Sequence, residues 1–96
     1  MARHDIVDLT DDSWIQLSNA DIQAATFMLV RDPRSDGADI AVTADATPPA
    51  DGTAYMAITR TDRAINEQLS DLFPGIASPV RLWARGKNVS IAISHA

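Results

Sequence analysis

The C-terminal stretch Pro79–Ser94, PVRLWARGKNVSIAIS, decides the fold class. Every second residue in each half is apolar: Val80, Leu82 and Ala84, then Val89, Ile91 and Ile93. A period of two is typical of a strand with one buried face, because successive side chains point to opposite sides of a sheet. The intervening Gly86-Lys87-Asn88 suits a short loop, since Gly and Asn both tolerate positive φ. The stretch therefore predicts a hairpin of two paired strands.

Shorter apolar runs precede this stretch, and residues that favour turns separate them. They cover residues 6–9, 14–17, 22–31, 40–43 and 54–59. Seven short strands with turns between them predict a mainly β fold, a small antiparallel β-sandwich or barrel. Within the third run, Thr26–Val30 is almost continuously apolar, which indicates a strand covered on both faces.

One segment departs from the strand pattern. Apolar residues recur at helical spacing over residues 63–73, Asp62 is placed to cap the start, and Pro74-Gly75 ends the run. We expect one short helical segment there. The alternative is an extended loop held down by Leu69 and Phe73.

Length and composition restrict the class of protein. The 96 residues predict one β domain over 1–96. The formal net charge of −5 argues against binding to nucleic acid or to an anionic membrane surface, since both need a basic face. The chain has no cysteine, so disulfides and thiolate chemistry are excluded. We found no signal peptide and no apolar run of membrane-spanning length, and we expect a cytosolic protein or one stabilised in an assembly.

Residues that carry chemistry are scattered. Asp32, Asp36 and Gly37 match part of a calcium loop, but Arg34 and Thr43 occupy positions where ligands are required. The loop 32–37 is therefore expected to be a turn in which Asp32 caps and Gly37 takes a left-handed conformation. The two histidines, His4 and His95, lie near the termini, where a catalytic triad is hard to build. We expect no catalytic residues, no metal and no cofactor.

Arginine and tryptophan share one face of the first strand in the decisive stretch, at Arg81, Trp83 and Arg85. These residue types are enriched at protein interfaces, although Trp83 would be a core residue if the register were inverted. Two apolar faces in so small a domain predict either a sandwich interior or a subunit interface. The candidate interface residues are Trp14, Phe27, Met28, Leu29, Arg81, Trp83 and Arg85.

The order of several motifs resembles a family of phage proteins. The motifs are W-I-Q-L at 14–17, T-F-M-L-V-R at 26–31, T-P-P-A-D-G-T at 47–53, L-W-A-R-G at 82–86 and a final V-S-I-A-I-S strand. This order is similar to that of small structural proteins of tailed bacteriophages, either capsid decoration (cement) proteins or domains of head and tail fibres. The resemblance implies a virion protein, assembled in the host cytoplasm. It also implies homo-oligomers, with a trimer as one expected form, that bind the lattice of the major capsid protein.

Three alternatives stay open at the level of sequence. One is a tail or head-fibre module that binds a receptor or glycan, with Trp14, Tyr55 and Trp83 stacking on sugar rings. Another is an enzyme on a β scaffold, which would need a pocket with two perturbed carboxylates. The last is a host-encoded adaptor with an immunoglobulin-like sandwich, because fold does not fix function.

Overall fold

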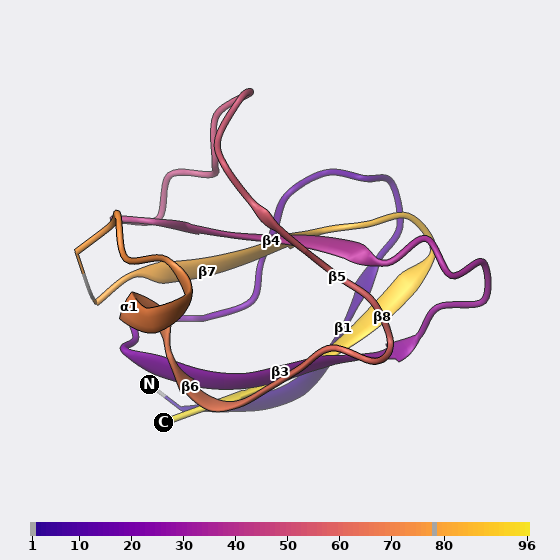
Figure 1. The fold of residues 1–96 in the computed structure, drawn as a ribbon, viewed down its shortest axis with the longest axis horizontal. Helices are drawn as coiled ribbons and strands as arrows, with labels where there is room; N and C mark the ends of the chain where they lie inside the picture. The colour runs from indigo at the N-terminus through magenta and orange to yellow at the C-terminus, as the bar shows by residue number, and fades with distance from the viewer. Residues whose placement is uncertain (1, 78) are drawn as a thin grey trace.

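The computed structural model describes residues 2–77 and 79–96, and these form two antiparallel sheets packed face to face (Figure 1). Sheet A has the strand order β1-β8-β3-β6, and sheet B has the order β2-β7-β4-β5. The elements are β1 (Arg3–Leu9), β2 (Ile15–Gln16), β3 (Ala24–Arg31), β4 (Ala38–Thr43), β5 (Met56–Ile58), β6 (Arg63–Gln68), α1 (Leu69–Leu72), β7 (Arg81–Arg85) and β8 (Val89–His95). The predicted mainly β sandwich is confirmed. The sheets remain separate, so the barrel alternative does not hold.

The prediction of a C-terminal hairpin is wrong in its pairing, although both strands exist. β7 pairs with β2 and β4 in sheet B, whereas β8 pairs with β1 and β3 in sheet A. The chain crosses between the sheets at the buried Gly86, where an added Cβ would meet side-chain atoms of Leu9 and Val89. The carbonyl of Gly86 accepts the backbone N–H of Asp12 at 2.9 Å. Both strands bury one face in the same core, so their period of two is the same whether they pair or cross.

The predicted helical segment is present but short. The helix covers only Leu69–Leu72, and residues 63–68 form the edge strand β6, which pairs with β3. A bulge in this pairing allows Ala64 and Leu69 both to be buried, although their odd separation of five positions would place them on opposite faces of a regular strand. At the bulge, Asn66 has φ 47° and its N–H donates to Oγ1 of Thr26 at 2.8 Å. Pairing with β6 satisfies the backbone N–H and C=O groups on the edge of β3 that faces away from β8. A helix at 63–68 would leave these groups without hydrogen-bond partners.

Alternate residues of the central strands fill the space between the sheets. Phe27 and Leu29 of β3 point into this core, and Leu82 and Ala84 of β7 enter it from the other sheet. All four are buried, because successive side chains of a strand point alternately into the core and away from it. The largest fully buried apolar side chains are Leu9, Leu17, Phe27, Ile40, Val42, Leu69, Val80, Leu82, Val89, Ile91 and Ile93.

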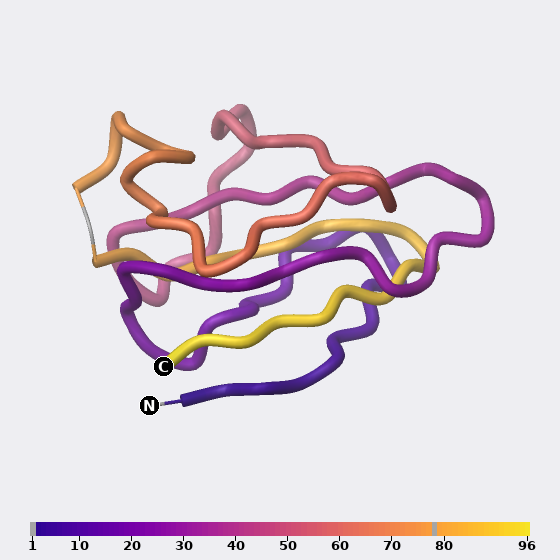
Figure 2. The backbone as a smooth tube through the Cα atoms, turned by 60° about the horizontal axis from the view of Figure 1, so that its bottom comes forward, coloured from indigo at the N-terminus to yellow at the C-terminus, as the bar shows by residue number. Residues whose placement is uncertain are grey.

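The two ends of the chain lie side by side (Figure 2), because β1 and β8 pair along their whole length from Arg3 opposite His95 to Leu9 opposite Val89. β8 therefore lies in the interior of sheet A, between β1 and β3. This arrangement makes β1 an edge strand and leaves the outer sides of β1, β8 and β3 as one continuous surface.

Candidate protein interface

The outward side chains of three neighbouring strands form a regular grid on sheet A. The strand registers align His4 with Ser94 and Thr26, Ile6 with Ala92 and Met28, and Asp8 with Ser90. We call this surface the sheet A face. Its central part consists of His4, Ile6, Asp8, Thr26, Met28, Ser90, Ala92 and Ser94, and Arg31 on β3 and Arg63 on the edge strand β6 extend it.

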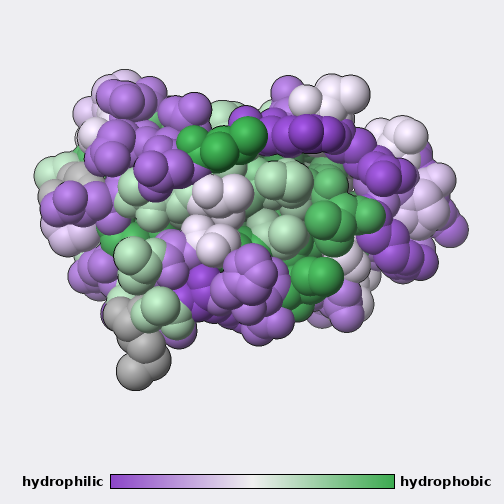
Figure 3. All heavy atoms as spheres, turned by 90° about the horizontal axis from the view of Figure 1, so that it is seen from below, coloured by the Kyte–Doolittle hydropathy of each residue, from purple (hydrophilic) through white to green (hydrophobic). Residues whose placement is uncertain are grey.

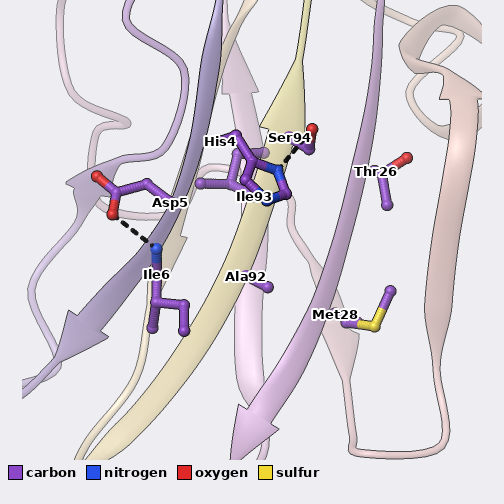
Figure 4. Close-up of a pocket in the computed structure, with 8 residues that line it drawn as sticks. All are labelled: His4, Asp5, Ile6, Thr26, Met28, Ala92, Ile93 and Ser94. Carbon is purple, nitrogen blue, oxygen red and sulfur yellow. Dashed lines mark hydrogen bonds between the residues drawn. The ribbon is translucent and has the colours of Figure 1, made fainter.

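A shallow channel runs along the middle of the sheet A face. All three outward residues of β8, Ser90, Ala92 and Ser94, are small. The longer side chains of Ile6 on β1 and Met28 on β3 flank Ala92 on its two sides (Figure 4). The depression at this place has a volume of about 500 Å³. The sheet A face therefore has a channel with one large apolar side chain, Ile6 or Met28, on each side of its middle.

The strands of sheet A expose large apolar side chains. Ile6 on β1 is 60% exposed, Val30 on β3 is 41% exposed, and Ile65 on β6 is 65% exposed. Figure 3 views the molecule from this side, and apolar surface crosses the middle of the face between hydrophilic rims. An antiparallel sheet that faces water on one side usually alternates apolar inward with polar outward residues. Sheet A departs from that rule at these three positions, whereas His4, Asp8 and Thr26 follow it.

Opposite charges lie on opposite sides of the channel. Asp8 on β1 accepts a hydrogen bond from Oγ of Ser90 at 2.7 Å. Across the sheet, Arg31 on β3 pairs in register with Ser90, and Arg63 on β6 pairs in register with Met28. Arg31 donates from Nη1 to Oδ1 of Asn88 at 3.1 Å, and both arginines are exposed. The β1 side of the face is thus acidic at Asp8, and the β3–β6 side is basic.

A second surface, the Arg85 cluster (Trp14, Asp39, Tyr55 and Arg85), lies on sheet B. The guanidinium carbon of Arg85 lies 4.4 Å from the ring centroid of Trp14 and 5.2 Å from that of Tyr55. Arg85 also donates from Nε and Nη2 to one carboxylate oxygen of Asp39, at 3.1 and 2.9 Å. The hydrogen bond that Arg85 donates to Asp39 is the main reason that the pKa of Arg85 is raised above its ordinary value. Stacking and ion pairing hold this arginine in one orientation.

The other two predicted residues of β7 are held by partners within the chain. Trp83 is buried on the outer side of sheet B, and its Nε1 donates to Oγ1 of Thr43 at 2.7 Å. Arg81 donates from Nε to Asp21 at 2.6 Å and is half-buried. The sequence reading that placed Leu82 and Ala84 inward and Trp83 on the opposite side is therefore confirmed, although Trp83 is covered.

The other five predicted interface residues divide into three groups in the structure. Phe27 and Leu29 are core residues, with exposures of 1% and 5%, so they present no side chain to a partner. Met28 lies on the sheet A face, and Trp14 and Arg85 belong to the Arg85 cluster. Sequence reasoning missed Ile6 and Ala92, because their importance depends on a register that brings the first and last strands together.

A serine–histidine contact occurs on the sheet A face. Nδ1 of His4 lies 3.2 Å from Oγ of Ser94, but the neighbouring Asp5 accepts the backbone N–H of Ile6 with its Oδ1. In the described part of the chain, no hydrogen bond of Asp5 orients the imidazole as a triad requires. Across residues 2–77 and 79–96, no three His, Asp or Glu side chains are grouped to hold a metal ion. The contact therefore lacks the third, orienting residue of a catalytic triad.

Comparison with known proteins found no matching family model, no matching curated protein and no matching solved structure. Among the described residues, no helix has the length and apolar character needed to cross a membrane.

Proposed function

We propose that this chain is a non-enzymatic structural protein of a tailed-bacteriophage virion, a capsid decoration protein that stabilises the head by binding the lattice of the major capsid protein. A protein that binds only the assembled shell stabilises the shell by mass action. To bridge neighbouring subunits, such a protein needs more than one contact surface.

The observation that carries the proposal is the presence of two interface-like surfaces on opposite sides of the sandwich. The sheet A face offers exposed apolar side chains around a channel. The Arg85 cluster offers an arginine stacked with two aromatic rings, and Trp, Tyr and Arg are the residue types that dominate interface energetics. The assignment to a virion rests on the motif resemblance. The acidic net charge agrees with this assignment, because the outer surface of a shell binds no nucleic acid.

The alternative of a glycan-binding fibre module has less support. Of its three proposed stacking residues, Trp83 is buried, and the ring of Trp14 is already in contact with Arg85. Tyr55 remains 52% exposed, but it too lies beside the guanidinium. A sugar ring would have to displace Arg85 from its ion pair with Asp39 to stack between these rings.

Co-sedimentation with capsids assembled from the major capsid protein of the same genome tests the proposal. We expect the chain to pellet with the capsids at a fixed ratio close to that of capsid subunits or capsomers. Tyr55→Ala should weaken binding by about tenfold, as expected of an interface aromatic, whereas Arg34→Ala, at an exposed position of the 32–37 loop, should not. Binding of only a few copies per capsid, or none, would overturn the proposal.

A further inference from the structure

We infer that the sheet A face binds a second copy of this chain, in a two-fold dimer whose axis runs along the strands between β8 and β3. The inference rests on the proposed assembly role of this face and names its partner. In this arrangement β1 of one copy lies over β6 of the other, and β8 lies over β3. The Arg85 cluster remains on the outer side of each copy.

Shape complementarity supports this axis. The outward residues of β8 are small, and those of β3 are larger, with Met28 in register with Ala92. When β3 of one copy lies over β8 of the other, the side chain of Met28 enters the channel above Ala92, and the symmetry repeats the contact. Methionine suits such a gap because its side chain is unbranched and adaptable.

Charge complementarity supports the same axis. Rotation about this axis carries the basic side of one copy over the acidic side of the other. Arg31 then lies above Ser90 of the other copy, one strand away from Asp8, which a long guanidinium side chain can reach. Each dimer gains two such ion pairs, because an isologous interface forms every contact twice. The same operation lays the aliphatic part of Arg63 over Ile6.

The size of the sheet A face determines how strong we expect the dimer to be. Four strands at about 4.8 Å and about seven residues at about 3.3 Å give a face of roughly 19 by 23 Å. Two such faces bury roughly 900 Å² in total, below the size of standard stable interfaces. We therefore expect a reversible dimer whose population rises with protein concentration, and which gains strength when copies are held close together on a lattice.

Two charge-reversal variants test the inference without a capsid. In a dimer of Asp8→Arg, each new arginine meets Arg31 of the other copy, and in a dimer of Arg31→Asp, each new aspartate meets Asp8. In a mixed dimer of the two variants, every pair is again of opposite sign. We expect each variant alone to dimerise at least about tenfold more weakly than the wild type, and an equimolar mixture to recover the lost affinity.

Sedimentation velocity over a range of concentrations gives the readout, with circular dichroism confirming the fold of each variant. The inference is overturned if the wild type stays monomeric or forms a trimer. It is also overturned if either variant alone dimerises like the wild type, or if the mixture associates no better than the separate variants. Capsid co-sedimentation is scored separately, so failure of the dimer is distinguishable from failure of the virion role.

Discussion

At the residue scale, Gly37 shows how one position enforces the path of the chain. It has φ 73°, and a Cβ added there would collide with the backbone carbonyl oxygen of Ile58 on β5. Gly52 has a similar φ of 84°, but a Cβ there would meet no atom within 4 Å. Substitutions at these two glycines therefore distinguish the destabilisation caused by the left-handed conformation from that caused by the collision.

We predict that Gly52→Ala lowers the free energy of unfolding by about 1–2 kcal/mol, the cost of a left-handed conformation for an L-residue. Gly37→Ala should lower it by about 1–3 kcal/mol more, since the β4–β5 pairing must shift to admit the methyl group. Urea denaturation of both variants measures the difference. Equal losses would show that the close approach of Gly37 to Ile58 is not present in solution.

Asp32 anchors the same loop. Its carboxylate is buried and accepts the N–H groups of Asp36 and Gly37 at 3.0 and 2.9 Å. We predict that Asp32→Ala destabilises the fold by about 1–3 kcal/mol, because a buried N–H loses its partner. Asp36→Ala removes an exposed carboxylate from the same loop and should change the stability by less than about 0.5 kcal/mol. Thermal unfolding of the two variants compares them, and similar midpoints would contradict this account.

This loop could be predicted from the sequence because its determinants are local. Asp and Gly at the ends of a short Pro-containing segment define a turn through their own backbone preferences. The sequence did not reveal that Asp32 is buried, because its burial depends on how the loop connects β3 in sheet A to β4 in sheet B.

At the element scale, the crossing from β7 to β8 distinguishes the observed sandwich from the predicted hairpin. Alternation at Val80–Ala84 and Val89–Ile93 predicts which side chains are buried, and the structure places them in the core. It does not predict which strands pair, since strand partners are chosen by contacts far away in sequence. The helical prediction over 63–73 was too long for a related reason, because residues 63–68 form a strand through pairing with β3, a partner far away in sequence.

Nuclear Overhauser contacts between backbone protons test the crossing. We predict contacts between Ala84 on β7 and Ile40 on β4, and between Ile91 on β8 and Leu29 on β3, which are paired in register. Backbone protons of directly opposed residues in antiparallel strands lie close enough to detect. Contacts between Trp83 and Ile91, which a hairpin with a three-residue loop would place opposite each other, would contradict the crossing.

The Arg85 cluster joins residues from two loops and two strands. The sequence therefore indicated two of its members, Trp14 and Arg85, as interface residues but could not predict their contact. We predict that Arg85→Lys lowers stability by about 1 kcal/mol, because lysine loses the planar stacking and the double hydrogen bond to Asp39. Arg60→Lys, at an exposed position, is the matched control and should be neutral. Chemical denaturation gives both values, and equal stability of the two variants would indicate that the cluster does not form.

At the scale of the whole molecule, the sandwich buries one side of each sheet and leaves two different outer surfaces. The sequence indicates more apolar surface than one small core requires, through runs such as Thr26–Val30. It does not locate the excess, because Ile6 at the start of the chain and Ala92 at its end become neighbours only through the pairing of β1 with β8. That pairing creates the sheet A face, on which the proposed assembly role depends.

The most direct test is sedimentation equilibrium of three proteins: the wild type, Ala92→Arg and Ala57→Arg. Ala92→Arg fills the channel on the sheet A face, whereas Ala57→Arg adds the same side chain at an exposed site on β5 of the other sheet. We predict that the wild type and Ala57→Arg show the same concentration-dependent dimerisation, and that Ala92→Arg remains monomeric while keeping its fold. Identical monomeric behaviour of all three proteins, or dimerisation unaffected by Ala92→Arg, would contradict the claim that this face is a protein contact surface.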